Sequence, residues 1–168
     1  ILIVLIVFTG CGQNRITEKE EKKETVESEM NAEVKKTAQT FRSVYMKEKS
    51  ELNTLKVKRK IINCLEEKGY AAVDCDNQID MVNREKVEEF CKAAEKEEQA
   101  AVDIVVVFDE GEIIQYHLES MNGKINVRLC QVKWKDNSPQ ANYYDEYEAY
   151  EWKYTCLLYT SPSPRDTR

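Results

Sequence analysis

The sequence predicts an α+β fold in which N-terminal helices precede an antiparallel β-meander of three to four strands with one helix packed on it. Apolar residues recur at helical spacing between residues 31 and 68. A β-branched run follows at 100–108, and the segments after it alternate apolar and polar residues around an Asn-Gly pair. The length of 168 residues suits one domain.

The first segment, Ile1–Phe8, is an unbroken apolar run. It is too short to cross ~30 Å of hydrocarbon, which takes about 20 helical residues. Because small residues follow it, the run fits the back half of a secretory signal peptide, and the reading frame is expected to begin before residue 1. The alternative is a short buried strand at the edge of a domain, with Cys11 as a core residue.

The end of this segment, Phe8-Thr9-Gly10-Cys11, resembles the lipobox of bacterial lipoproteins. The resemblance implies cleavage before Cys11, attachment of diacylglycerol to its sulfur, and a place on the extracytoplasmic face of the cell membrane. Stable anchoring needs more than one acyl chain, at about 0.8 kcal/mol per buried methylene, and diacylglycerol supplies two. We therefore predict a partial signal peptide at 1–10 and lipidation at Cys11.

Residues 11–30 are rich in Glu and Lys and have almost no apolar side chains. This composition predicts a charged tether, with weak helical support from Glu–Lys pairs four residues apart. The domain, residues 31–155, is expected to begin with helices at Asn31–Lys49 and Glu51–Lys68, the second ended by Gly69. The expected apolar faces are Val34, Ala38, Phe41, Val44 and Tyr45, then Leu52, Leu55, Ile61, Ile62 and Leu65.

A short strand expected at Tyr70–Asp74 leads into the acidic segment 74–80. The three aspartates of this segment suggest a calcium loop, and Glu85 stands where the twelfth ligand would be. The sixth position is Ile79, however, where an EF-hand loop has Gly. A polar turn is therefore favoured, and no metal site is predicted.

A third helix is expected at Arg84–Glu98, with Asn83 as its N-cap. Its apolar stripe favours core packing over a partner groove and consists of Val87, Phe90, Cys91 and Ala94. The run Ala100–Phe108 predicts a strand buried on both faces, or nearly so.

Alternation predicts two further strands, Glu112–Glu119 and Lys124–Trp134, joined by a hairpin at Asn122-Gly123. The first places Ile114, Tyr116 and Leu118 on one face. In the second, the apolar phase slips near Cys130, which predicts a bulge there.

Residues 136–139 are expected to form a loop before a fourth strand at Tyr143–Tyr154. The alternating Tyr150, Trp152 and Tyr154 could stack on sugars or bind a partner, although packing against further sequence is favoured. Residues 156–168 look like a translated sequencing-adapter tail, and the alternative is a natural disordered C-terminus. A foreign tail would make the chain an N-terminal fragment, whose missing part should cover the open edge of the sheet.

No catalytic, cofactor or metal site is predicted. The single histidine, His117, has no Ser, Cys or metal partner that the sequence fixes, and no Gly-rich phosphate loop or hydrolase motif occurs. A net charge of −6 argues against nucleic acid. The disulfide state of four cysteines stays open, with core thiols favoured: Cys64, Cys75, Cys91 and Cys130.

The segment from Gly69 to Tyr154 is similar to a family of uncharacterised lipoproteins from Gram-positive bacteria, Lachnospiraceae-like gut Firmicutes. The resemblance implies a domain of unknown function in a longer protein, with further β-rich sequence after Lys153, and it brings no catalytic residue. It rests on Gly69-Tyr-Ala-Ala-Val-Asp74, Asp76-Asn-Gln-Ile-Asp80, the Val102–Phe108 run, and Asn137-Ser-Pro139 leading into Tyr143-Tyr-Asp-Glu-Tyr147.

Together these features predict a membrane-anchored, extracytoplasmic lipoprotein. The favoured role is a non-catalytic binding or interaction module with a protein or glycan partner. One alternative is the N-terminal part of an envelope enzyme whose active site lies in a missing C-terminal region, and another is a spacer domain without a ligand.

Overall fold

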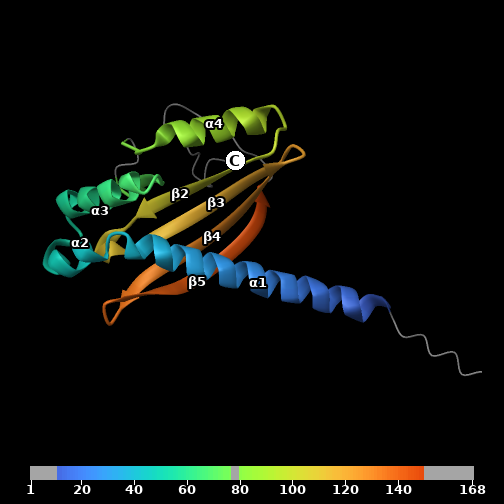
Figure 1. Ribbon diagram of the computed structural model, residues 1–168, viewed down its shortest axis with the longest axis horizontal. Coiled ribbons are helices and arrows are strands. Elements are labelled where there is room, and N and C mark those ends of the chain that lie inside the picture. The colour runs from blue at the N-terminus through green and yellow to red at the C-terminus, as the bar shows by residue number, and fades with distance from the viewer. Residues whose placement is uncertain (1–10, 77–79, 150–168) are drawn as a thin grey trace, which may run out of the picture.

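The computed structural model describes the backbone of residues 11–76 and 80–149, and the side chains of this part from residue 23 onward. Its centre is a five-stranded mixed sheet with helices on both faces (Figure 1). The α+β class is confirmed, with five strands in place of three to four. In spatial order these are β1 (Ala71–Asp74), β2 (Ala100–Val107), β3 (Ile113–Met121), β4 (Lys124–Lys135) and β5 (Ser138–Ala149).

β1 is parallel to β2, and the other neighbouring strands are antiparallel. The crossover between the two parallel strands contains α4 (Arg84–Glu95), the third helix of the prediction. α4 packs on the sheet as predicted, through its buried Phe90, Cys91 and Ala94.

The N-terminal helix α1 spans Cys11–Gln39 and therefore runs through the segment expected as a charged tether. Figure 1 shows that α1 crosses in front of β4 and β5 and extends well beyond the sheet. From residue 23 onward, Met30 is the first buried side chain of α1. One continuous helix was expected over Asn31–Lys49. In the structure α1 ends at Gln39, and two separate elements follow, α2 (Arg42–Lys47) and the 3₁₀ turn η1 (Lys49–Glu51).

Helix α3 (Leu55–Glu67) matches the second predicted helix, and Thr54 caps it by accepting a 3.4 Å hydrogen bond from the Val57 amide. Gly69 follows at a φ of +82°, which a residue with a side chain adopts only at a cost, so the predicted stop is confirmed. The predicted apolar face is buried except for Leu55, which is exposed in the first turn.

Two hydrophobic cores lie on opposite faces of the sheet. The first joins α1 and α3 to the face of β2 that carries Val105 and Val107, and the second joins α4 to the face that carries Val102 and Ile104. Because side chains alternate along a strand, β2 serves both cores, as its apolar run predicts. Within the predicted buried run Ala100–Phe108, the side chain of Ala101 is the exception, because it is exposed.

Asn83 occupies the N-cap position of α4, as predicted, but its side chain makes no capping hydrogen bond. Its φ of 49° is left-handed, whereas a capping residue is extended and turns its side chain toward the first helical amides. The Asn83 Nδ2 instead donates to the Tyr70 carbonyl at 2.8 Å and to the Glu66 carbonyl at 3.2 Å. Asn83 thus ties the start of α4 to the connection between α3 and β1.

The hairpin turn Asn122-Gly123 is confirmed, since both residues have the positive φ values that a tight two-residue turn needs. Asp136 and Asn137 form a second turn of this kind, where a longer loop was expected. Pro139 therefore lies inside β5, opposite Trp134, and is buried.

An irregularity occurs near Cys130 as predicted, in the pairing of β4 with β5: the register shifts between Gln131 and Val132, and Asn142 of β5 is the extra residue. The register of β4 with β3 runs without a break from Lys124 to Val132. The apolar phase changes for another reason. Ile125 and Val127 face the α4 core, whereas Cys130 and Val132 face the core of α1 and α3.

Candidate functional site

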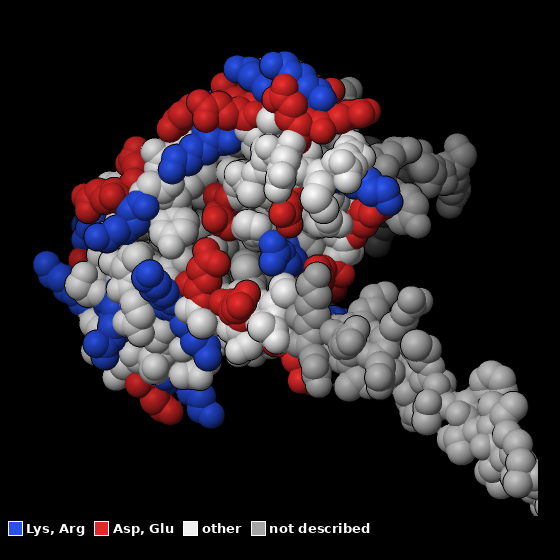
Figure 2. Space-filling model, turned by 45° about the vertical axis from the view of Figure 1, so that its right-hand side comes forward, with Lys and Arg blue, Asp and Glu red and all other residues white. Residues whose placement is uncertain are grey.

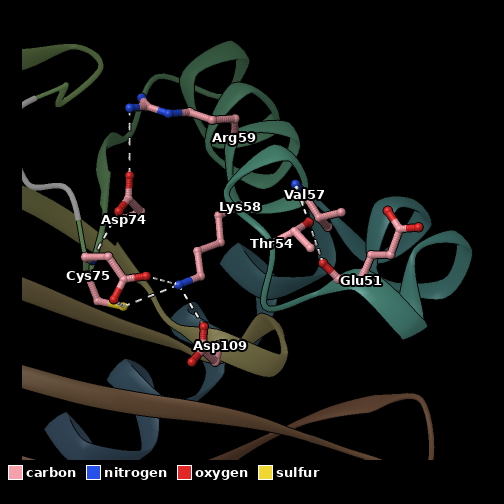
Figure 3. Close-up of polar contacts among 9 residues, drawn as sticks. Glu51, Thr54, Val57, Lys58, Arg59, Asp74, Cys75 and Asp109 are labelled. Carbon is pink, nitrogen blue, oxygen red and sulfur yellow. Dashed lines mark hydrogen bonds and ion pairs between the residues drawn. The ribbon is translucent and has the colours of Figure 1, made fainter.

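The acidic segment after β1 meets basic side chains from α3 (Figure 3). Lys58 is 1% exposed, and its Nζ lies 2.7 Å from Asp109 Oδ1 and also contacts the Asp76 carboxylate. Burial opposes the charge of Lys58, but the hydrogen bonds to Asp109 and Asp76 outweigh it and raise the pKa above its ordinary range. Lys58 is therefore a protonated structural group and not a nucleophile.

The pKa values of two neighbours of Lys58, Asp76 and Cys75, are shifted as well. The hydrogen bond from Lys58 lowers the pKa of Asp76, which stays ionised. The Cys75 Sγ lies 3.7 Å from Lys58 Nζ, yet burial raises the pKa of this thiol in spite of the nearby ammonium. Cys75 is accordingly a neutral thiol without the activation that a catalytic cysteine requires.

Arg59 pairs with the other two carboxylates of the acidic segment. Its Nη2 lies 2.5 Å from Asp80 Oδ2 and 3.8 Å from the buried Asp74 Oδ2. The carboxylates considered for calcium are thus ion-paired with α3, which fits the polar turn, although residues 77–79 lie outside the described part. Among the described residues, no group of three or more His, Cys, Asp or Glu side chains could hold a metal ion.

His117 lies on the face of β3 opposite Tyr116 and Leu118, as predicted, and the structure gives it a partner. Its Nδ1 is 2.9 Å from Asp103 Oδ1 on β2. His117 is also paired across the sheet with Arg128, and Arg128 with Glu146. We call these four residues, Asp103, His117, Arg128 and Glu146, the polar row.

The polar row is open to solvent. The side chains of Asp103, His117 and Arg128 are 32%, 23% and 24% exposed, so a ligand could reach them. Arg128 Nη2 also lies 3.5 Å from Glu119 Oε2. In the described part of the chain, no Ser, Thr or Cys side chain hydrogen-bonds to His117, so the pair has the base and orienting carboxylate of a hydrolytic triad without its nucleophile.

Next to the row, a buried network joins β3 to α1. Gln115 is fully buried, and its Oε1 lies 2.7 Å from Thr37 Oγ1, while its Nε2 lies 3.3 Å from Glu33 Oε1. Thr37 Oγ1 is also 3.1 Å from the Tyr70 hydroxyl. The burial of Gln115 was not predicted from the sequence. The only indication of it was that Gln115 lies two residues from Ile113 and therefore shares its buried face.

A cleft of about 540 Å³ lies beside the start of β2. β1 pairs only with Ile104–Val107, so within the described ranges Ala100–Asp103 has no strand on that side. Tyr70, Lys86, Glu89, Ala93, Ala101 and Asp103 are among the lining residues, and we call this hollow the β2 cleft. Because Asp103 belongs to both, the β2 cleft and the polar row form one continuous candidate site.

Exposed aromatic side chains occur on β5 at two positions that were not singled out from the sequence. Tyr143 and Tyr147 are 53% and 46% exposed. Tyr147 pairs with Val127 of the second core, which places it on the α4 side of the sheet. The predicted Tyr150, Trp152 and Tyr154 lie outside the described residues.

The four cysteines of the domain are free thiols. The core-thiol interpretation is confirmed for Cys91 and Cys130, which are buried, and burial raises the pKa of Cys130 to about 11. Cys64 and Cys75 are half-buried.

Cys11, the predicted lipidation site, is the first residue of α1. Its side chain is not among those described, and lipidation stays a prediction. No helix in the described part of the chain is long and apolar enough to cross a membrane.

Comparison with known sequences gives a match over most of the chain. The model of a family of unknown function, DUF6070, matches residues 23–160. The match therefore includes every strand of the sheet as well as the polar row and the β2 cleft. No curated protein matches the chain, and no solved structure does.

Proposed function

The chain belongs to the DUF6070 family of unknown function, and from that premise we propose that it is a lipid-anchored, extracytoplasmic protein whose domain is a non-catalytic binding module. We propose further that Cys11 carries the lipid and that the protein is a lipoprotein of Gram-positive origin. The single observation that carries the binding role is the half-exposed polar row on three central strands and β5, continuous with the β2 cleft.

The anchor is supported by the lipobox-like motif and by the length of α1. At 1.5 Å per residue, the helix from Cys11 to Met30 would be about 28 Å long, which would hold the domain clear of the lipid headgroups. A net charge of −6 also disfavours contact between the domain and anionic lipids.

The binding role is supported by the chemistry of the exposed groups. The polar row offers donors and acceptors of both charges in one line, which suits a polar ligand such as a peptide or a glycan. Figure 2 shows acidic and basic side chains interspersed over one face, with a dense band of both along the top, where α4 lies. Such mixing argues against nucleic acid, which requires clustered basic surface.

The alternative is the N-terminal part of an enzyme with its active site in further C-terminal sequence, and the His117–Asp103 pair is the observation that favours it. A nucleophile from that sequence would complete a triad. The test is whether a longer chain of the same gene reacts with a fluorophosphonate probe and loses this reaction in the His117→Ala variant. That result would favour the enzyme over the binding module.

The anchor is tested by growing cells with radiolabelled palmitate. We expect the wild-type chain to take up the label and to stay in the membrane fraction, and the Cys11→Ala chain to do neither. Equal membrane retention of both chains would contradict the anchor.

The binding role is tested with the full chain as Cys11→Ala and two probes, purified peptidoglycan for a glycan and a random heptapeptide library for a protein. We expect one probe to bind and Arg128→Ala to weaken it. Lys124→Ala is the matched control, because this exposed lysine of β4 lies outside the row. Binding of neither probe would overturn the module.

A further inference from the structure

Within the described residues, the start of β2 is an open strand edge. β1 ends its pairing at Ile104, and α4 lies above the strand without forming backbone pairs with it (Figure 1). An unpaired edge is a template for another chain, and proteins usually cover it or place charges along it. Here the edge begins with two uncharged residues, Ala100 and Ala101, and Asp103 places a charge only at its end.

Strand geometry fixes which backbone groups face this edge. The Val107 carbonyl accepts a 2.9 Å hydrogen bond from the Cys75 amide, just past β1, so Val107 turns its backbone groups toward the β1 side. Backbone direction alternates along a strand, and Ala101, six residues earlier, therefore turns its N–H and C=O to the same side. Ala101 is exposed and lines the β2 cleft, so the strand edge meets the cleft at this residue.

The side chains around this edge select the occupant. Small residues, Ala93 and Ala101, leave room for a side chain of a bound peptide. Glu89 is exposed on α4 and Asp103 lies at the end of the edge. Lys86, the basic residue of this lining, already donates to the Gly69 carbonyl. Glu89 and Asp103 carry two negative charges against the one positive charge of Lys86, so the lining has a net charge of −1 and favours a basic ligand.

We propose that the β2 cleft binds an extended peptide with a basic residue, which adds as a short strand to the Ala100–Asp103 edge. The inference names the partner class of the proposed binding module and rests on that proposal. Main-chain hydrogen bonds to Ala101 hold the peptide, and Glu89 and Asp103 pair with its basic side chain.

The test uses the full chain as Cys11→Ala with a heptapeptide library that has Lys fixed at its centre, and a Glu-centred library for comparison. Ala101→Pro removes the edge N–H and leaves the amides that face β3 in place. Ala101→Ser keeps the N–H and a small side chain, and is the matched control. Glu89→Lys, on the exposed surface of α4, reverses the charge without touching the strand.

We expect the strongest Lys-centred peptide to bind the wild type and Ala101→Ser alike, and Ala101→Pro about tenfold more weakly. Glu89→Lys should weaken it about threefold and favour the Glu-centred library. Exchange of the Ala101 amide with deuterium should slow when the peptide is bound. Circular dichroism checks that each variant is folded. If Ala101→Pro does not fold, Glu89→Lys still tests the site.

Two results would overturn the inference in distinguishable ways. Peptides that bind Ala101→Pro as well as the wild type leave a binding module but exclude strand addition. Peptidoglycan binding with no peptide binding also keeps the module and excludes a peptide partner. Loss of both probes instead removes the module on which the inference rests.

Discussion

At the scale of single residues, the clearest feature is the unequal exposure of an ion-paired cluster. Lys58 is buried, whereas its partners Asp76 and Asp109 are 72% and 64% exposed. Removing the ammonium therefore leaves two carboxylates in water, but removing the carboxylates leaves a charge inside the protein. The two changes should differ in cost even though they break the same contacts.

We predict that Asp76→Asn combined with Asp109→Asn destabilises the domain more than Lys58→Met does. An uncompensated buried ammonium costs about 3 kcal/mol, whereas a methionine of similar shape should cost about 1 kcal/mol or less. Urea unfolding of both variants measures the difference. Equal losses would mean that Lys58 is hydrated in the folded state.

The same pair predicts a pH dependence. Because Lys58 lowers the pKa of Asp76 below its ordinary 3.8, the stabilisation is present above pH 3.8 and is lost as the pH falls through the lowered value. The difference in unfolding free energy between the wild type and Asp76→Asn should be constant from pH 5 to 7 and shrink below about pH 4. A difference that grows in acid would reverse the assigned sign.

A buried hydrogen bond gives a third residue-scale prediction. Thr37→Val leaves the Gln115 carbonyl without its 2.7 Å partner inside the core and should cost about 1–3 kcal/mol. Adding Gln115→Leu removes the stranded group, so the double variant should lose less than the sum of the two single variants. Additive losses in a double-mutant cycle would show that the two side chains do not interact.

At the scale of elements, α1 combines a projecting half with a packed half. Buried contacts of its described side chains begin at Met30 and continue through Val34 and Ala38 to the sheet. A polar helix without such contacts is only marginally stable, because the hydrogen bonds gained by extending the helix must offset the unfavourable free energy of forming its first turn. The first half of α1 should therefore add helix but little stability to the domain.

We predict that deleting residues 12–22 lowers the helical signal in circular dichroism and leaves the urea midpoint unchanged. Val34→Ala, in the packed half, should instead cost about 2 kcal/mol, because it opens a cavity in the first core. A midpoint that falls on deletion would show that the projecting half is also packed.

The sheet shows which elements a single sequence can predict. Asn122-Gly123 and the run from Ala100 carry local signals, and both structures formed as expected. The phase change at Cys130 was read as a bulge because alternation records burial and not which core buries a residue. Only the opposite placement of α1 and α4 explains it.

The candidate site was predictable only in its parts. His117 was placed on its correct face, but its partner Asp103 lies on another strand, and local patterns do not encode register between strands. The β2 cleft could not be predicted at all, because it exists only where the short β1 ends beside the longer β2. The acidic segment 74–80 was predicted to be a polar turn because it lacks the glycine of a calcium loop. Its ion pairs with Lys58 and Arg59 of α3 were not predicted.

At the scale of the whole molecule, the two cores share β2, β3 and β4 as a common wall. Elements that share buried strands should unfold together, because exposing either face of the sheet removes support from the other. Trp134 reports on the first core, where it stacks on Tyr45 with ring centroids 4.0 Å apart and donates a 2.9 Å hydrogen bond to the Gly111 carbonyl.

We predict that Phe90→Ala, in the second core, destabilises the whole domain by about 3–5 kcal/mol. In a Trp152→Phe background, the fluorescence of Trp134 and the far-ultraviolet circular dichroism should shift to lower urea together, although Phe90 lies on the opposite face of the sheet. Coincident transitions would show that one cooperative unit supports both the polar row and the β2 cleft. If Trp134 kept its midpoint while the dichroism lost part of its signal early, α4 would unfold independently, and the β2 cleft would open without loss of the polar row.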